Sequence, residues 1–423
     1  MPSPDPTQLN SAKSMSSTSA RWRRIGATLG PGLIVMLADN DAGSVITAAQ
    51  SGAQWGYRLL LLQFAIVPLL FMVQELAARL GLTTGKGFGE LVRQRFGKTL
   101  AIISAITLLA SCFGALVTQM SGLAGIGQLF GVPVCLTIGL LVALTLLMIW
   151  TGSYHSVERI AMFFGVFGLA FVLVAWKAHP DFALALVHLR EVPITDSGYL
   201  YLVAANLGTS IMPWTVFYQQ SAMIDKGLSV QDLKVARIET FVGALICQIL
   251  TASVLVASAA TLGQHHGGVT LDSVPQIAIA FTHALGDTFG RIVFALGLSG
   301  CALVAMIVVC LTAAWAVGEA TGVRHSLEQH PAEAPRFYAA LVVMLVGAGA
   351  LVCSGINLVR LSIATGVVNA LLLPVVMGLL YRLARTELPE PNRLRGRYAV
   401  AVAVVFSLTA ALGLYAGVVG SLT

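Results

Sequence analysis

Two aspartates lie two positions apart in an otherwise apolar stretch of the chain. The segment "GPGLIVMLADNDAGSVITAAQ", residues 30–50, is long enough to form a membrane-spanning helix, yet Asp39 and Asp41 fall near its middle. A carboxylate at bilayer depth is costly, so such residues usually mark a functional site. Carboxylate oxygens are also ligands for divalent cations. The pair therefore predicts a cation site inside the membrane.

The composition is that of a membrane protein. Of the 423 residues, 57% are hydrophobic and 10% are charged, whereas a soluble domain carries about 25% charged residues. The net charge of +6 is then evidence on topology and not on binding to nucleic acid. Residues 1–25 are polar and Ser-rich, which predicts a disordered cytoplasmic tail without a cleavable signal. Residues 26–423 are predicted to form a single transmembrane domain.

Apolar runs of about 20 residues, the length that crosses a bilayer, predict eleven helices. They lie near 28–51, 58–82, 99–130, 132–152, 157–176, 197–222, 237–262, 288–318, 337–355, 357–381 and 397–420. The division between the ninth and tenth runs falls at "VCSGIN".

The basic residues orient these helices. Of the 25 Lys and Arg residues, twenty fall in segments on the same side as the N-terminus. The five on the other side are Arg58, Lys177, Arg190, Arg291 and Arg360. Because cytoplasmic loops carry the excess of Lys and Arg, the N-terminus is predicted to be cytoplasmic and the C-terminus extracellular. The lack of a targeting signal favours a prokaryotic plasma membrane.

Two of the predicted helices carry features that interrupt a helix. In the first, Gly43 lowers helix propensity just after the acids. In the sixth, "ANLGTSIMPWTVFYQQSA", Gly208 and Pro213 bracket Met212. Freed backbone groups at that depth are tolerated where they line a cavity. Broken first and sixth helices indicate two inverted five-helix repeats around a midplane site. The repeats would span about 26–178 and 197–383, followed by an extra helix at about 397–420.

The spacing of the two acids limits their roles. In an intact helix, residues two apart point to nearly opposite sides. Both carboxylates could therefore meet one ion only if the backbone unwinds between them. Otherwise Asp41, beside Gly43 and Ser44, is the ligand. Asp39 would then support the ligands from behind, hold a proton, or line the access path.

Three segments resemble one known family. "GPGLIVMLADNDAGSVITAAQSGAQWGY" is similar to the first helix of the NRAMP divalent-metal transporters, whose motif is Asp-Pro-Gly-Asn. "QELAARLGLTTGKGFGELVRQRFG" resembles the second helix and its following loop, and "GTSIMPW" resembles the sixth-helix motif Ala-x-x-Met-Pro-His. The resemblance implies an all-α LeuT-type fold of eleven or twelve helices. It also implies a divalent cation as substrate, with no cofactor, no nucleic acid and no obligate protein partner.

The resemblance assigns site residues position by position. Asp41 matches the aspartate that coordinates the metal, and Met212 matches the methionine that binds it. Ser44 stands in place of the coordinating asparagine. Thr209 stands in place of the alanine whose carbonyl meets the ion. These four residues are the predicted metal ligands.

Departures from the family pattern concern proton transfer. Trp214 replaces the histidine that relatives associate with proton movement. The acidic residue of the third helix has no counterpart, since Thr118 and Gln119 are uncharged. Asp39 falls where relatives usually have a non-acidic residue. Proton coupling needs groups that titrate near ordinary pH, so transport without proton coupling is predicted.

The donor types bear on the ion. A thioether such as that of Met212 favours Mn²⁺, Fe²⁺ or Cd²⁺. The smaller Ser44, the extra carboxylate and the hydroxyl of Thr209 instead suit a partly hydrated Mg²⁺. This pattern resembles the NRAMP-related magnesium transporter (NRMT) branch, and it predicts import of Mg²⁺, with Mn²⁺ a possible second ion. Gln219 and Asn369 are further candidates to line the path.

Other functions are compatible with parts of the sequence. A proton-coupled Mn²⁺/Fe²⁺ symporter would need Asp39 to replace the lost proton groups. An organic-substrate carrier can share the fold, but two aspartates would repel a carboxylate substrate. A sensor would need a signalling domain. An enzyme is not expected, because no nucleophile–base pair or phosphate loop is present.

Two further patterns predict structural roles. Glu75 and Arg79, one helical turn apart near the inner end of the second helix, predict a salt bridge. All six cysteines fall in apolar segments, which predicts small buried side chains and neither disulfides nor a zinc cluster.

Overall fold

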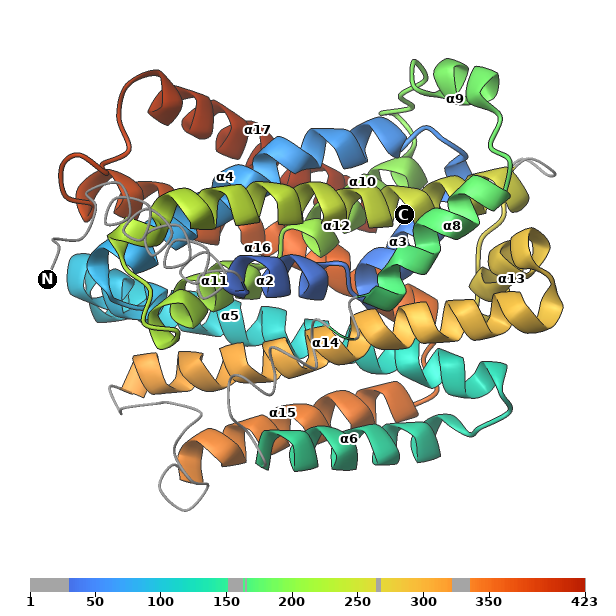
Figure 1. The fold of residues 1–423 in the computed structure, drawn as a ribbon, viewed down its shortest axis with the longest axis horizontal. Coiled ribbons are helices and arrows are strands. Elements are labelled where there is room, and N and C mark those ends of the chain that lie inside the picture. The colour runs from blue at the N-terminus through green and yellow to red at the C-terminus, as the bar shows by residue number, and fades with distance from the viewer. Residues whose placement is uncertain (1–29, 151–162, 164–165, 264–267, 322–334, 423) are drawn as a thin grey trace, which may run out of the picture.

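The computed structural model describes residues 30–150, 163, 166–263, 268–321 and 335–422. The predicted tail at 1–25 and the beginnings of the first and fifth predicted spans lie outside these residues. The described part is helical throughout and contains no strand. Figure 1 shows the helices as a bundle whose long members run along one axis.

The elements follow one another as helices joined by short turns. The first half of the chain contains α2 (Pro31–Asp39), α3 (Ala42–Trp55), α4 (Leu60–Thr84), α5 (Phe88–Leu129), α6 (Val134–Trp150), the 3₁₀ turn η1 (Val166–Leu169), α8 (Ala170–Lys177) and α9 (Phe182–His188). The second half contains α10 (Ser197–Ser210), α11 (Pro213–Asp225), η2 (Val230–Asp232), α12 (Leu233–Thr261), α13 (Val274–Leu285), α14 (Asp287–Thr321), α15 (Pro335–Cys353), α16 (Leu358–Thr386) and α17 (Gly396–Ser421).

The predicted spans coincide with helical segments in the described residues. The first is divided into α2 and α3, and the sixth into α10 and α11. Seven helices of the described part are long and apolar enough to cross a membrane, or eight if the bent pair around α8 and α9 is one span. The shorter apolar helices are Val134–Leu147, Val274–Leu285 and Leu341–Cys353. The predicted division at "VCSGIN" is confirmed, because α15 ends at Cys353 and α16 begins at Leu358.

Two helices lie where only loops were expected. They are α9, with seven residues, and α13, with twelve. Both are too short to span a bilayer, so a search for apolar runs of spanning length does not find them. In α13, Phe281 is buried and packs its ring against Phe294 of α14 and Phe171 of α8. This helix therefore covers the ends of two spans.

The pairing of helices reflects the inverted repeat. The second span contacts the seventh (α4 with α12), the third contacts the eighth (α5 with α14), and the fourth contacts the ninth (α6 with α15). A two-fold relation between halves brings equivalent helices together in this way. In Figure 1, α6 and α15 lie together along the lower edge, beside α14. The broken helices lie inside this frame.

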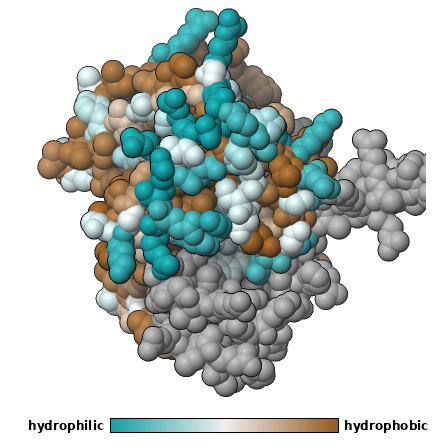
Figure 2. All heavy atoms as spheres, turned by 90° about the vertical axis from the view of Figure 1, so that its left-hand side faces the viewer, coloured by the Kyte–Doolittle hydropathy of each residue, from teal (hydrophilic) through white to brown (hydrophobic). Residues whose placement is uncertain are grey.

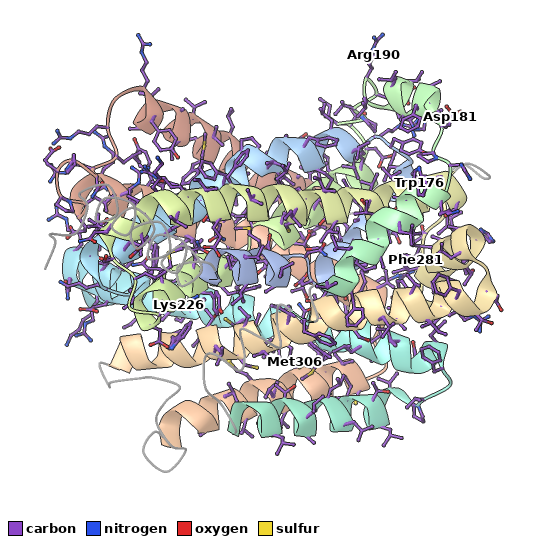
Figure 3. All side chains as sticks on the ribbon, viewed as in Figure 1. Trp176, Asp181, Arg190, Lys226, Phe281 and Met306 are labelled. Atoms are coloured by element: carbon purple, nitrogen blue, oxygen red, sulfur yellow. The ribbon has the colours of Figure 1, made fainter. Side chains whose placement is uncertain are left out.

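One end of the bundle is strongly polar. Figure 2 looks onto this end, where hydrophilic side chains project between apolar flanks. Figure 3 places Lys226 toward this end, and Trp176 and Asp181 toward the other. The predicted salt bridge belongs to the polar end: Arg79 Nη2 lies 2.6 Å from Glu75 Oε1, and Arg237 of α12 adds a second ion pair at 2.6 Å. The prediction from the second helix is confirmed and extended to α12.

The cysteines follow the prediction in four of six positions. Cys112, Cys247, Cys301 and Cys310 are buried, and all six are free. Burial was wrong for Cys135, which is exposed, and for Cys353, which is half-buried. Both lie on α6 and α15 at the edge of the bundle. There an apolar residue can face the membrane as well as the core, as Leu136 and Leu140 do.

Candidate cation site at two helix breaks

The first break lies between α2 and α3, at Asn40 and Asp41. Asp41 has an extended backbone (φ −88°, ψ −178°) and caps α3, because its Oδ1 accepts the Ser44 backbone N–H at 2.8 Å. Aspartate is a preferred residue at this position. Gly43 lies in the first turn of α3, after the break. A Cβ there would lie 3.2 Å from Asp41 Oδ1 and 3.4 Å from Thr118. Gly43 therefore leaves room for the carboxylate.

The second break lies between α10 and α11, at Ile211 and Met212. Met212 is extended (φ −93°, ψ 139°), and Pro213 follows at the start of α11. Proline is favoured there because its missing N–H would have no partner in the first turn. The Met212 carbonyl accepts the Thr215 hydroxyl at 2.8 Å. The predicted interruptions of the first and sixth helices are thus both present.

Ser44 joins the two breaks. Its Oγ lies 2.9 Å from the Asp39 carbonyl oxygen and 3.0 Å from the Thr209 carbonyl oxygen. A hydroxyl carries one proton, so it donates to one of these carbonyls at a time. The end of α2, the start of α3 and the end of α10 consequently meet at one point. The hydroxyl of Thr209 itself donates to the Ala205 carbonyl at 2.9 Å.

Gln119 of α5 holds Asp41 from the other side. Its Nε2 donates to Asp41 Oδ2 at 2.5 Å, and its Oε1 accepts the Ala42 N–H at 3.0 Å. Gln119 is fully buried. Both carboxylate oxygens of Asp41 are therefore held by a neutral donor, and each retains acceptor capacity for a cation. Sequence reasoning passed over Gln119 as a ligand support because it searched the third helix for titratable groups. A lone amide in an apolar helix was the available signal.

Asp39 faces a different helix. The thiol of Cys247 in α12 lies 3.7 Å from its Oδ2, and its Oδ1 has no hydrogen-bond partner among the described residues. The neighbouring Asn40 contacts Cys301 at 3.4 Å and Thr251 at 3.1 Å. The backbone unwinding that would let both acids meet one ion is present. Their carboxylates nevertheless contact opposite neighbours, with Asp41 on α5 and Asp39 on α12.

The sulfur of Met212 already has a partner. Trp214 Nε1 donates to Met212 Sδ at 3.1 Å, and both side chains are buried. The indole replaces the imidazole that the resemblance led us to expect. In this arrangement the thioether is turned toward its own helix neighbour and is not free as a soft ligand.

Two path candidates lie apart from the breaks. Gln219 donates to the Thr240 hydroxyl of α12 at 3.2 Å. It follows Met212 by seven residues, or about 10 Å along a helix. Asn369 is buried in α16, which packs against α10, and its Oδ1 has no partner in the described part of the chain. The structure connects neither residue to Asp41.

The four predicted ligands are enclosed and dominated by oxygen. Asp41, Ser44, Thr209 and Met212 are each at most 3% exposed. Within the described residues no group of three or more His, Cys, Asp or Glu side chains could hold a metal ion. The donors at the breaks are one carboxylate, one hydroxyl and main-chain carbonyls. Such a set suits a hard cation that keeps part of its water.

Comparisons with known proteins agree with this geometry. The family described as natural resistance-associated macrophage protein-like (Nramp) matches residues 32–418. The divalent metal cation transporter MntH of Verminephrobacter eiseniae is 26% identical over 379 residues, covering 85% of this chain and 82% of that protein.

Two solved structures share the fold. A manganese transporter of Eremococcus coleocola, crystallised with an aromatic bis-isothiourea compound, superposes with a TM-score of 0.75 at 17% identity, covering 93% of this chain and 86% of that one. Mhp1, a nucleobase-cation-symport-1 family transporter, superposes with a TM-score of 0.60 at 16% identity, covering 92% and 90%. These likenesses confirm the predicted LeuT-type architecture.

Proposed function

The chain belongs to the Nramp family, and from this premise we propose that it imports Mg²⁺ without coupling to protons. Membership makes it a divalent metal cation transporter of the Nramp type and not an enzyme. The proposal concerns the ion and the coupling. Alternating access around Asp41 would carry the ion from outside, with the N-terminus cytoplasmic, in a prokaryotic plasma membrane.

The observation that carries the choice of ion is the occupied sulfur of Met212. Mn²⁺ and Cd²⁺ gain over Mg²⁺ from a soft ligand. With Trp214 Nε1 donating to the thioether at 3.1 Å, that advantage is reduced. What remains toward the break is oxygen from Asp41, Ser44 and Thr209. Asp39, buried without a cationic partner among the described residues, adds negative charge that attracts a divalent ion.

The absence of proton coupling is supported by Gln119 and Trp214. An amide holds Asp41 through two hydrogen bonds, and neither an amide nor an indole titrates near neutral pH. A membrane potential of about −90 mV would itself favour entry of a divalent ion by roughly 4 kcal/mol, at about 2.3 kcal/mol per charge per 100 mV. Uptake without protons is therefore energetically sufficient.

The test is ion uptake into proteoliposomes. Vesicles containing the wild type or Asp41→Ala would be loaded with a Mg²⁺-sensitive dye and a pH dye, and assayed in parallel with Mn²⁺. We expect Mg²⁺ entry that Asp41→Ala abolishes, with no internal acidification. Asp272→Asn, in an exposed loop, is the matched control and should transport normally.

The second candidate is a proton-coupled manganese symporter. It is favoured by the names of the relatives, which include a divalent metal cation transporter and a manganese transporter. Uptake of Mn²⁺ but not Mg²⁺, accompanied by acidification, would establish this alternative and reject the magnesium proposal.

A further inference from the structure

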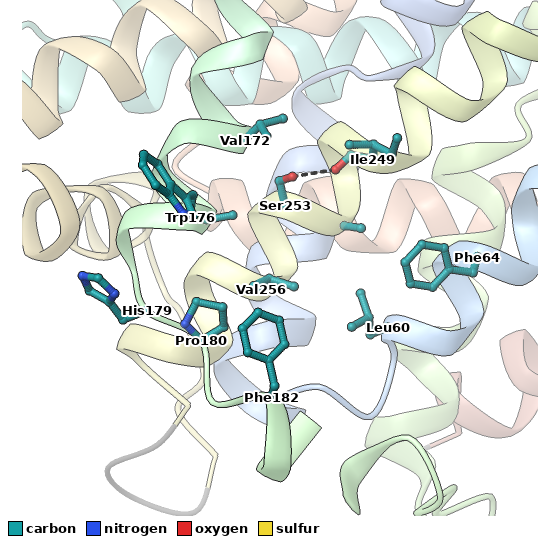
Figure 4. A pocket seen from close by; sticks show the side chains of 12 residues that line it. Leu60, Phe64, Val172, Trp176, His179, Pro180, Phe182, Ile249, Ser253 and Val256 are labelled. Atoms are coloured by element: carbon teal, nitrogen blue, oxygen red, sulfur yellow. Dashed lines mark hydrogen bonds between the residues drawn. The ribbon is translucent and has the colours of Figure 1, made fainter. Parts of the chain in front are cut away.

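An apolar groove lies on the outer surface of the bundle, away from both helix breaks. Its volume is about 550 Å³. Four helices form it, as Figure 4 shows. The lining residues are Leu60 and Phe64 of α4, Val172, Ala175 and Trp176 of α8, His179 and Pro180 of the following turn, Phe182 of α9, and Ile249, Ala252, Ser253 and Val256 of α12.

The groove is deep because its floor is made of small residues. Ala175, Ala252 and Ser253 are each less than 10% exposed, whereas Trp176 and Phe182 on the walls are 72% and 76% exposed. The one hydroxyl on the floor is already satisfied, since Ser253 Oγ donates to the Ile249 carbonyl at 2.7 Å. The floor therefore offers apolar contact and no free polar group.

The groove opens onto the membrane-facing belt of the protein. Phe64 and Ile249 at its edge are 54% and 40% exposed, and Leu61 beside them is 53% exposed. An occupant that enters from this side comes from the hydrocarbon region of the bilayer.

A cation marks the rim. Lys177 ends α8, and its Nζ lies 5.7 Å from the centroid of the Trp176 ring, which lines the groove. Tryptophan and lysine at the end of a span are the residues found at the membrane–water interface. A positive charge at that depth complements a lipid phosphate. The rim thus supplies a position for a headgroup above an apolar slot.

We propose that this groove binds a membrane phospholipid, with one acyl chain on the floor of Ala175, Ala252 and Ser253 and the phosphate at Lys177. The bound chain packs against the outer face of α12. The inner face of the same helix carries Cys247 and Thr251, which contact Asp39 and Asn40 at the first break. The lipid consequently braces the helix that supports the cation site.

The test is lipid retention measured by native mass spectrometry of the purified full chain. Phosphatidylglycerol and phosphatidylcholine with identical acyl chains are the probes. Ala252→Phe fills the floor, and Ser253→Leu is a milder second variant. Val404→Phe, at a half-exposed position of α17, is the matched control. We expect one tightly held phospholipid on the wild type and on Val404→Phe, and binding weakened about ten-fold, or about 1.4 kcal/mol, in Ala252→Phe.

The headgroup is tested separately. Lys177→Gln should weaken binding of phosphatidylglycerol about five-fold, because a basic residue near the surface contributes about 1 kcal/mol. Arg360→Gln, an exposed cation elsewhere, should change nothing. Equal retention by the wild type, Ala252→Phe and Ser253→Leu would overturn the site, as would replacement of the lipid by detergent on the wild type. Unchanged lipid binding in Lys177→Gln would overturn the position of the phosphate.

Discussion

The two helix breaks are made by different means. At the first, between α2 and α3, polar side chains from three other helices hold the backbone: Gln119 bonds Ala42 and Asp41, while Cys301 and Thr251 bond Asn40. At the second, between α10 and α11, the chain interrupts itself. Pro213 starts the new helix, and Trp214 and Thr215 bond back to Met212.

This difference separates two tasks. The second break is fixed by its own sequence, so it can present the Thr209 carbonyl as an unchanging surface. The first break depends on neighbours on α5, α12 and α14, so its geometry follows the positions of those helices. A site that must open to each side in turn needs one fixed wall and one wall that responds to the bundle. We assign the responsive role to the break that carries the acids.

The sharpest test of this comparison neutralises the charge at the first break. Asp41→Asn keeps the shape and the cap on α3, because asparagine is an equally good N-cap. It removes the charge that a divalent cation requires. We expect Mg²⁺ uptake to fall more than about 100-fold, beyond the 10–100-fold typical of groups behind a ligand, with little change in melting temperature.

Asp39→Asn is the companion measurement for Asp41→Asn. Because Asp39 contacts α12 and not the joining serine, we expect its loss to slow uptake while ion binding persists. Loss of binding in both variants would mean that the two acids act as one site, and the assignment of Asp41 as the sole carboxylate ligand would be wrong.

The next test loosens the first break without touching an acid. Gln119→Leu removes the hydrogen bonds to Asp41 Oδ2 and the Ala42 N–H. A group that orients a ligand typically contributes 10–100-fold to metal affinity, so the half-saturating Mg²⁺ concentration should rise about ten-fold while the maximal rate changes less. Gln128→Leu, exposed on the same helix, is the control. A fall in maximal rate alone would show that Gln119 supports the fold and not the carboxylate.

A smaller effect is expected at the second break. Trp214→Phe keeps an aromatic ring but removes the N–H that occupies Met212 Sδ. One hydrogen bond is worth about 0.5–1.5 kcal/mol, so we expect Cd²⁺ to compete with Mg²⁺ uptake about five-fold better. Adding Met212→Leu should abolish the gain. If competition by Cd²⁺ is unchanged in Trp214→Phe, the sulfur does not face the ion in any state.

Sequence alone reached the architecture because each span is a long apolar run, and reached the breaks because proline and buried acids are rare in such runs. It located Asp41, Ser44, Thr209 and Met212 through resemblance. It did not find the roles of Gln119 and Cys247. Their side chains are ordinary occupants of an apolar helix, and only packing brings them to the acids.

The limits of pattern reading are also visible at the edges of the bundle. Helix α13 escaped because its twelve residues resemble a loop when only spanning lengths are sought. The exposure of Cys135 escaped because, in a membrane, an apolar residue can be in contact with lipid as readily as with protein. The indole–sulfur bond between Trp214 and Met212 depends on rotamers, which no sequence pattern encodes.

The smallest effect concerns how the two half-helices are anchored at their outer ends. Helix α10 is capped by its own Asp196, whose Oδ1 accepts the Tyr199 N–H at 3.0 Å. Helix α2 borrows a cap instead: Glu239 Oε1 of α12 accepts the N–H groups of Gly30 at 2.6 Å and Leu33 at 2.9 Å. Glu239→Gln keeps an acceptor but loses the charge facing the helix dipole, worth about 0.3–1 kcal/mol. We expect a melting temperature lower by about 1–2 °C and a faster transport cycle, because α2 separates from α12 more easily. Asp196→Asn should leave both quantities unchanged. A slower cycle in Glu239→Gln would mean that this cap positions the first break and does not restrain it.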